Sequence, residues 1–416
     1  MGSNSHRLSL QYRTLAQNAS TQVVAALGVY VQVPFCASKC TFCNFSSRVE
    51  RSAIFGAYAR AIQREIAEGP DWAAQVGIPP ALFGHPVDSI YFGGGTPTLL
   101  GEVLLRGIVG ALQESMRWGP DVEFTLEITP GSADASLLAA LRRMEMNRLS
   151  IGAQTLDEKE LRVLGRLHSV DETAALVRDA RHSGFQNISL DLIAGLPYQT
   201  PESFRRSLEA VARLRPEHIS LYLFEADEKS RLGREVVHGG NRYHAGSIPD
   251  EEFMAEAYEA GCEFLSREGF QQYEISNFAL PGFESRHNQK YWQLAPYLGL
   301  GAGAHSFDGA RRWSNLIDPR SYIAKVEAGQ LPIDDFRALT GEEQVEEFFF
   351  LGLRQSQGVS LEKASQQWGP DCLKRWEAKI QTLVQDGWLI HQNGCVQMAR
   401  RAYLVSNEIF QEFVSI

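Results

Sequence analysis

Three cysteines lie close together at Cys36, Cys40 and Cys43, with three and then two residues between them. Thiolates are the soft ligands that iron–sulfur clusters select, and a [4Fe-4S] cluster held by only three of them leaves its fourth iron open to an outside ligand. Zinc is the alternative, but a structural zinc site takes four protein ligands and no fourth cysteine or histidine lies nearby. The spacing therefore predicts a [4Fe-4S] cluster with one open iron.

A second group of polar residues lies at or just past the ends of short apolar stretches. It comprises Gly93, Gly94, Gly95, Thr96, Glu127, Gln154, Asp191 and Glu225. Parallel barrels build their sites at the carboxyl ends of their strands, and glycines let a ligand approach the backbone. Carboxylates there can accept hydrogen bonds from hydroxyl groups. A tight turn is the alternative for the glycine run, and a helix cap or a surface pair is the alternative for each polar residue.

Apolar strands that alternate with amphipathic helices must position these residues. Strands are expected at 28–35, 87–92, 122–128, 148–153, 188–193 and 218–224, with helices of ordinary length between them. Connections of this kind produce parallel pairing through right-handed crossovers. Because only six strands precede the next change of pattern, the sequence predicts an α/β fold with a partial, TIM-like (β/α)6 barrel and a lateral gap.

Length, charge and cysteine content narrow the class of protein. A chain of 416 residues is longer than one core usually grows, which predicts a large and a smaller domain. The net charge of -10 argues against nucleic acid as a partner. Scattered Cys262, Cys372 and Cys395 suit a reducing compartment, no apolar run is long enough for an integral membrane segment, and residues 1–20 have no signal-peptide core. We expect a cytoplasmic protein.

The pattern changes beyond Asp308. Helical spacing at 342–354, 360–368 and 372–386 precedes an expected hairpin around Asn393 and Gly394. This order predicts a helical, winged-helix-like domain at 309–416, after an N-terminal segment at 1–27 and the barrel with its extension at 28–308. Residues 372–386 are mixed in charge, so a lid or a partner-docking surface is favoured over DNA binding.

The segment His287-Asn288-Gln289-Lys290-Tyr291-Trp292 carries a further pattern. In a helix, His287 lies one turn from Tyr291, and Asn288 lies one turn from Trp292. This arrangement suits a haem, because imidazole is a common axial ligand and aromatic faces can cover the macrocycle. The alternative is a histidine that is hydrogen-bonded within the core. A glycine-rich segment follows and ends at His305, a second candidate ligand.

Together these motifs resemble the radical S-adenosylmethionine (SAM) superfamily and, over most of the chain, its oxygen-independent coproporphyrinogen III oxidase-like family. The resemblance rests on the segments 30–36, 89–98, 127–130, 148–154, 191–197 and 287–292. The chain resembles the haem chaperone subgroup most, in which the HNxxYW motif is associated with haem binding. The pattern around 404–408 resembles the same subgroup.

The resemblance implies a set of cofactor contacts. Cys36, Cys40 and Cys43 would hold the [4Fe-4S] cluster, and the amino and carboxylate groups of SAM would chelate its open iron. One SAM molecule, or two, would contact Tyr30, Phe42, Gly94, Gly95, Thr96, Glu127, Gln154, Arg166 and Asp191. Haem would contact His287, Asn288, Tyr291 and Trp292, with His305 as a further candidate.

Departures from the family pattern bear on the activity. True oxidases carry another cysteine two positions after the third cluster ligand, where this chain has Phe45. This difference argues against coproporphyrinogen oxidase activity. Gln32 stands where both oxidases and chaperones usually have a histidine, and Asn44 stands where the chaperones often have an aspartate. None of these changes affects a cluster ligand.

These inferences predict a protein that holds a [4Fe-4S] cluster, SAM and haem and transfers haem to an acceptor protein. The implied partners are that acceptor and an electron donor such as flavodoxin or ferredoxin. A class C methyltransferase acting on a conjugated substrate and an oxygen-independent coproporphyrinogen III oxidase are the enzymatic alternatives. A structural protein with a vestigial cluster is a third class, which the retained cysteines and glycine run disfavour. Whether SAM is cleaved or only bound stays open.

Overall fold

The computed structural model describes residues 26–415, so the expected N-terminal segment 1–27 lies almost entirely outside the described residues. Six parallel strands pair in chain order at the centre of a twelve-stranded sheet. They are β1 (Leu27–Val33), β2 (Val87–Gly94), β3 (Trp118–Ile128), β4 (Arg148–Gln154), β5 (Asn187–Ala194) and β6 (His218–Leu223). These are the six strands predicted from the sequence, and the partial (β/α)6 barrel is confirmed.

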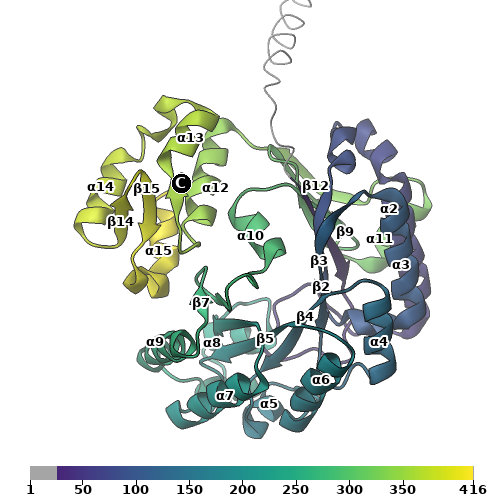
Figure 1. Ribbon diagram of the computed structural model, residues 1–416, viewed down its shortest axis with the longest axis horizontal. Helices are drawn as coiled ribbons and strands as arrows, with labels where there is room; N and C mark the ends of the chain where they lie inside the picture. The colour runs from purple at the N-terminus through teal and green to yellow at the C-terminus, as the bar shows by residue number, and fades with distance from the viewer. Residues whose placement is uncertain (1–25, 416) are drawn as a thin grey trace, which may run out of the picture.

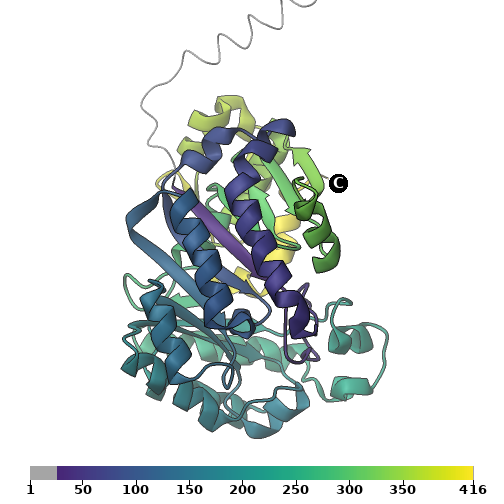
Figure 2. The same ribbon diagram turned by 90° about the vertical axis from the view of Figure 1, so that its right-hand side faces the viewer.

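Helices cover the outer face of this curved sheet (Figure 1). They are α2 (Phe55–Gln75), α3 (Gly101–Ser115), α4 (Ala135–Arg143), α5 (Glu158–Val163), α6 (Val170–His182) and α7 (Pro201–Leu214). Figure 2 shows α2 and α3 lying side by side across the outside of β1. Local signals set their starts: Thr200 caps α7 and Pro201 occupies its first position, where a missing N–H costs nothing.

The sheet is wider than the six predicted strands. On the β1 side it continues with parallel β9 (Tyr297–Leu300) and antiparallel β10 (His305–Phe307), β11 (Arg311–Asn315) and β12 (Ile333–Ala338). On the β6 side it continues with antiparallel β8 (Asn277–Ala279) and β7 (Gln271–Gln272). The predicted boundary at 308/309 falls inside the β10–β11 hairpin, so the change of architecture comes after Ala338 instead. The added strands are too short to show a periodicity.

Four more helices belong to the large sheet. α10 (Arg286–Trp292) lies inside its curve (Figure 1), while α11 (Pro319–Glu327) packs against α2 and α9 (Glu251–Arg267) packs against α7. α8 (Arg231–Val237) packs against the 3-10 helix Arg242–Ser247. Short 3-10 helices lie at Ser52–Ile54, Pro80–Gly84, Pro97–Leu100, Arg242–Ser247, Pro370–Leu373 and Arg400–Val405.

A small C-terminal module follows the large sheet. It contains α12 (Gly341–Gly352), α13 (Leu361–Trp368), α14 (Glu377–Gln385) and α15 (Ser406–Gln411), with a sheet of β13 (Val359–Ser360), β15 (Cys395–Met398) and β14 (Leu389–Gln392). Asn393 and Gly394 connect β14 to β15 with φ angles of 52° and 73°, as a two-residue hairpin turn requires. The predicted hairpin is therefore confirmed, and the order of elements is consistent with a winged helix.

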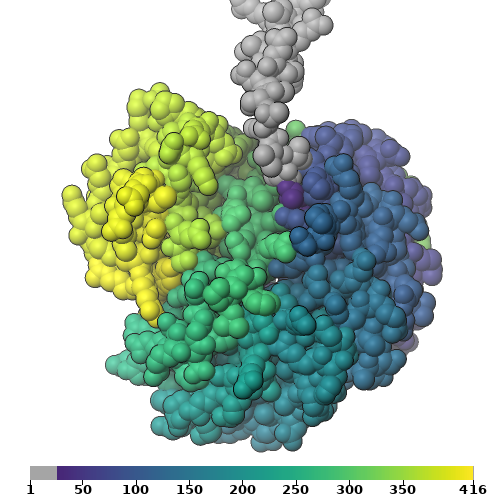
Figure 3. Space-filling view, in the orientation of Figure 1, coloured from purple at the N-terminus to yellow at the C-terminus, as the bar shows by residue number. Residues whose placement is uncertain are grey.

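Helix α10, which carries the HNxxYW motif, lies inside the curve of the sheet and not outside it (Figure 1). The Glu123 carboxylate of β3 accepts hydrogen bonds from the backbone N–H groups of Arg286 (2.9 Å) and His287 (3.0 Å) at the start of α10. Lys290 forms an ion pair with Asp88 at 2.7 Å. In the space-filling view, this part of the chain fills the space between the barrel and the C-terminal module (Figure 3).

A buried carboxylate ties α2 to the opposite end of the chain. Glu65 accepts hydrogen bonds from the Gly301 N–H (2.8 Å), the Asn315 side-chain amide (2.6 Å) and the Tyr322 hydroxyl (2.6 Å). Burial raises the pKa of Glu65 to about 7, against the effect of these donors. The network holds the loop after β9 beside β1.

This raised pKa makes stability depend on pH. Since the folded-state pKa lies above the ordinary value of 4.5, the contribution of Glu65 is fully present below that value and is lost as the pH rises through 7. Relative to Glu65→Gln, the wild type should lose on the order of 2 kcal/mol of unfolding free energy between about pH 5 and about pH 8. Chemical unfolding of both proteins at each pH measures this difference, and parallel profiles would contradict it.

Candidate cofactor-binding site

The three cysteines lie on a loop between β1 and α2 that is closed by its own contacts. The backbone N–H of Cys36 donates to the Arg48 carbonyl at 3.0 Å, and the Arg48 N–H donates to the Pro34 carbonyl at 2.8 Å. The Lys39 ammonium donates to the carbonyls of Phe45 (2.6 Å) and Ser47 (2.9 Å). The loop therefore has a defined shape built from its own residues.

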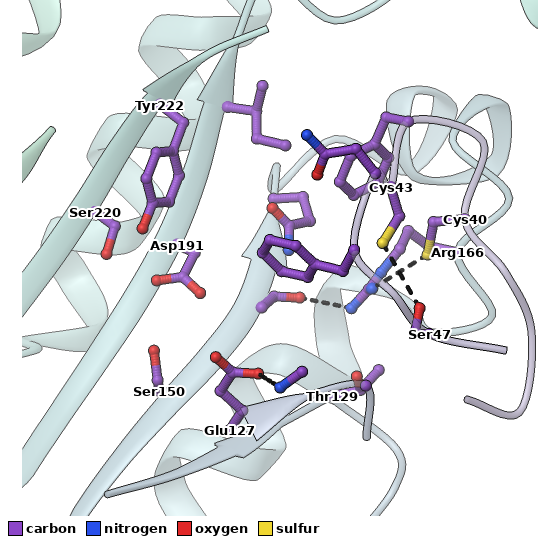
Figure 4. Close-up of a pocket in the computed structure, with 18 of the residues that line it drawn as sticks. Cys40, Cys43, Ser47, Glu127, Thr129, Ser150, Arg166, Asp191, Ser220 and Tyr222 are labelled. Atoms are coloured by element: carbon purple, nitrogen blue, oxygen red, sulfur yellow. Dashed lines mark hydrogen bonds between the residues drawn. The ribbon is translucent and has the colours of Figure 1, made fainter. Parts of the chain in front are cut away.

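The thiols of this loop all face one cavity. Cys36, Cys40 and Cys43 are half-buried and none is in a disulfide. The Cys43 thiol lies 3.9 Å from the Ser47 hydroxyl, and an Arg166 guanidinium N–H points to the Cys40 sulfur at 3.5 Å, as Figure 4 shows. Burial raises the pKa of the Cys36 thiol, and the neighbouring thiols add to the rise.

The donor set fits an iron–sulfur cluster. Cys36, Cys40 and Cys43 come from one loop and line one cavity. A [4Fe-4S] cluster spreads its ligands over separate irons, and three soft donors on one loop leave one iron facing the cavity. The residues present therefore fit the predicted [4Fe-4S] cluster.

The glycine run after β2 packs directly under the cysteine loop. A Cβ on Gly95 would lie 2.5 Å from the Phe35 carbonyl oxygen and 2.7 Å from that of Val33, so no larger residue fits. The Thr96 N–H donates to the same Phe35 carbonyl at 2.7 Å. Gly94 has a φ of 100° and packs against Gln32, the residue that departs from the family histidine. The glycines thus permit a close backbone approach.

Two half-buried carboxylates line the cavity beyond the glycines. Glu127 accepts hydrogen bonds from the Gly94 N–H (2.8 Å) and the Tyr91 hydroxyl (3.0 Å), and burial raises its pKa to about 7. Burial also raises the pKa of Asp191 to about 6, although nearby Ser220 and Ser150 oppose the rise. Figure 4 shows both carboxylates facing the open space. Each can accept further hydrogen bonds from ligand hydroxyl groups.

Gln154 and Arg166 connect this wall to the cysteine loop. Gln154 ends β4 with a φ of 67°, a left-handed conformation that is uncommon for a residue with a side chain. Arg166 donates to the Gly152 carbonyl at 2.6 Å and also points to Cys40. The Arg166 Nε is buried without a partner in the described residues. The guanidinium therefore has capacity for a ligand carboxylate.

The cavity has a volume of about 850 Å³ and extends from the cysteine loop to the C-terminal module. Most of the predicted cofactor residues line it together: Cys36, Cys40, Phe42, Cys43, Gly94, Gly95, Thr96, Glu127, Gln154, Arg166, Asp191 and Asn288. Its far end is formed by Ser406 and Asn407, from the segment 404–408 that resembles the chaperone subgroup, and by residues that the sequence analysis did not single out: Tyr258, Ile275, Arg354 and Tyr403. The cavity is larger than a cluster bound to the cysteine loop would fill by itself.

Other predicted residues do not line the cavity. His287 is 1% exposed, and its ring nitrogens lie 3.1 Å from the Ser89 hydroxyl and 2.9 Å from the Tyr291 hydroxyl. Burial lowers the pKa of His287 to about 3. An axial bond to haem iron would have to break one of these contacts, so the structure gives His287 the surroundings of a core histidine.

Of the aromatic residues around His287, Tyr30 and Tyr291 also lie outside the cavity wall, whereas Tyr91 lines it. Tyr30 stacks on Tyr91 with ring centroids 5.8 Å apart, and Tyr91 does reach the cavity. Trp292 packs under the Arg354 guanidinium at 4.5 Å. His305 is exposed at the start of β10 and is not part of the wall.

The sequence contains one pattern that could have identified two of the cavity residues that the sequence analysis missed. Along β4, the alternate positions Arg148, Ser150, Gly152 and Gln154 all line the cavity, while Leu149, Ile151 and Ala153 are buried on the other face. A parallel strand that is covered on both faces would be apolar throughout. Polar residues at every second position therefore indicate an interior cavity, and they would have identified Arg148 and Ser150.

A partial barrel with a three-cysteine loop after β1 and a glycine run after β2 is the architecture of radical SAM proteins. Residues 30–211 match the model of the Radical SAM superfamily, and residues 339–405 match that of the HemN C-terminal domain. The chain is 33% identical over 386 residues to the heme chaperone HemW of Bacillus subtilis, covering 92% of this chain and 98% of that protein. The chain belongs to the HemW family of radical SAM proteins.

Two further similarities extend this result. Radical S-adenosyl methionine domain-containing protein 1, mitochondrial, of Bos taurus is 33% identical over 346 residues, covering 80% of this chain and 74% of that protein. The structure of coproporphyrinogen III oxidase HemN from Escherichia coli aligns with a TM-score of 0.81 at 24% identity, covering 96% of this chain and 93% of that one, which confirms the fold. The family implies a [4Fe-4S] cluster and SAM.

No helix in residues 26–415 is long and apolar enough to cross a membrane.

The placement of the thiols predicts which cysteines matter. Replacing Cys36, Cys40 or Cys43 with alanine should remove most of the cluster's broad visible absorbance and bound iron after anaerobic reconstitution, since three ligands are the minimum here. Cys395→Ala is the matched control, because that half-buried cysteine lies in β15, outside the cavity wall. An intact four-iron spectrum in any of the three loop variants would refute the assignment.

Proposed function

We propose that this protein binds haem in the cavity, beside a [4Fe-4S] cluster and SAM, and delivers the haem to an acceptor protein. The observation that carries the proposal is the single cavity that joins the cysteine loop, Asn288 of the HNxxYW helix and the C-terminal module. The relatives named heme chaperone, which align along almost the whole chain, support the same function.

The end of the cavity at the strand ends suits the cluster and SAM. Cys36, Cys40 and Cys43 would hold the cluster, which supplies an electron for cleavage of the SAM sulfonium when both are bound. The backbone at Gly94, Gly95 and Thr96 would receive the amino group of SAM. The other polar groups of SAM would contact the side chains of Glu127, Gln154, Arg166 and Asp191, and Phe42 would pack beside the ligand. Tyr30 would act indirectly, since its ring stacks on the ring of Tyr91, which lines the cavity.

The far end of the cavity suits a flat conjugated ligand. Tyr258 and Tyr403, from two different elements, line this end, and Tyr222, near the carboxyl end of β6, is 40% exposed and lines the cavity on the SAM side. Aromatic faces of this kind pack against a macrocycle. We assign Asn288 as the haem contact of the motif, with His287 and Tyr291 holding α10 in position, and Trp292 supporting Arg354.

The partners in this proposal are an acceptor protein and an electron donor. A flavodoxin or a ferredoxin would reduce the cluster if SAM is cleaved. The scattered free thiols support a cytoplasmic location for these encounters.

Haem titration of the purified protein tests the proposal. The wild type should bind haem with a shifted Soret band, and Asn288→Ala should weaken binding by about tenfold through loss of a polar contact. His287→Ala should instead lower the free energy of unfolding by about 1 to 3 kcal/mol, because Ser89 and Tyr291 lose their partner, and leave haem affinity of the folded protein unchanged. Cluster iron content is the control for both variants.

The results of this titration distinguish a failure of the haem function from a wrong choice of haem-contacting residue. A wild type that leaves the haem spectrum unchanged would contradict the chaperone function. Haem affinity that falls in well-folded His287→Ala, with Asn288→Ala unaffected, would restore His287 as the haem ligand.

Coproporphyrinogen oxidation is the second candidate, favoured by the shared fold of HemN. Phe45 is 60% exposed on the cysteine loop, where the oxidases carry a further cysteine. We therefore expect no decarboxylation of coproporphyrinogen by reconstituted protein supplied with SAM and a reductant. Product analysis by chromatography measures this, and turnover to protoporphyrinogen would reverse the assignment.

A further inference from the structure

Arg148 is a buried cation without a direct ion-pair partner in the described residues. It is 1% exposed, lies at the start of β4 and lines the cavity. Its guanidinium makes no hydrogen bond and no ion pair within 4 Å to any residue of the described chain 26–415, and its Nε is buried without a partner. A buried charge of this kind is costly unless it is paired, so a missing partner is expected.

Two carboxylates that sense the charge of Arg148, Glu127 and Asp191, are already engaged elsewhere. Glu127 accepts from the Gly94 N–H and the Tyr91 hydroxyl, and Asp191 faces Ser220 and Ser150. Neither forms a direct contact with the guanidinium, which leaves its fork of donors available to the cavity.

The neighbouring histidines cannot take this role either. His218 and His287 both lie within the electrostatic reach of Arg148. The ring nitrogens of His218 contact Ser189 at 2.7 Å and Tyr273 at 2.8 Å, and those of His287 are also occupied. An imidazole would in any case not supply a negative charge.

The position of Arg148 decides which ligand group it meets. Arg148 lies six positions before Gln154 on β4, which places it roughly 20 Å from the strand end that faces the cysteine loop. The SAM carboxylate belongs at the cluster, at that strand end. Arg148 lies instead at the level of α10, the helix that contributes Asn288. The carboxylate of a cluster-bound SAM therefore does not reach Arg148, and an anion at Arg148 has to come from another ligand of the cavity.

We propose that Arg148 is the carboxylate-binding residue at the inner end of the cavity and receives a propionate group of the bound tetrapyrrole. The proposal rests on the proposed function and adds the group that orients the ligand. A guanidinium presents two parallel N–H donors that match the two oxygens of a carboxylate. With one propionate fixed beside α10, the macrocycle would extend toward Tyr222 and the SAM end.

Esterified haem provides the test. Reconstituted wild type, Arg148→Met and Arg148→Lys are titrated with haem and with haem dimethyl ester, and SAM affinity is measured in parallel. The wild type should prefer haem to the diester by about tenfold or more, as expected for one charge-assisted pair. Arg148→Met should lose that preference, Arg148→Lys should keep part of it, and SAM affinity should stay unchanged.

Arg354→Met is the matched control, since Arg354 lines the same cavity but has Glu274 as a partner at 3.6 Å. This variant should keep the preference for haem. If Arg148→Met does not fold, the wild-type comparison of the two ligands and the Arg148→Lys variant decide. Three results would overturn the proposal. The wild type could bind both ligands equally, Arg354→Met alone could lose the preference for haem, or Arg148→Met could lose SAM affinity. A wild type that binds neither ligand refutes the proposed haem function itself.

Discussion

The site depends on one backbone contact, between the cysteine loop and the glycine run. The Phe35 carbonyl, one residue before the first cysteine, accepts from the Thr96 N–H and lies so close to Gly95 that a Cβ there would collide with it. This contact fixes the loop after β1 to the loop after β2. Because Glu127 also binds the Gly94 N–H, the third strand is tied to the same point. The thiols, the backbone groups and the first carboxylate therefore keep their relative positions.

A second constraint sets the size of the cavity. The motif helix α10 is anchored inside the barrel by Glu123 and Lys290, and the C-terminal module packs beside it (Figure 1). The open side of the partial barrel is thus walled by residues far apart in the sequence. This arrangement leaves one continuous space in which a small cofactor near the strand ends and a larger flat ligand beyond it have separate walls.

Local patterns predicted the six strands, the cysteine loop and the residues of the strand ends, because those features depend on periodicity and spacing. The core position of His287 was one of two alternatives that the sequence left open. Its contact with Tyr291 follows from their spacing of one helical turn, but its contact with Ser89 of β2 depends on how α10 packs against the sheet, which the sequence does not reveal. Arg148 was missed although it begins the segment 148–154, which carries part of the family resemblance. Its lack of a direct partner appears only when the surrounding side chains are placed. The short strands β7 to β12 have too few residues for a periodic signal.

The central claim is that one cavity holds both the cluster and the haem. A crystal structure of anaerobically reconstituted protein with haem, with anomalous diffraction at the iron edge, tests it most directly. The account predicts a four-iron peak at Cys36, Cys40 and Cys43 and a separate single-iron peak within the cavity, between Tyr222 and Asn288. A haem iron on the outer surface, such as beside the exposed His305, would contradict the account, as would a cavity that holds no second iron.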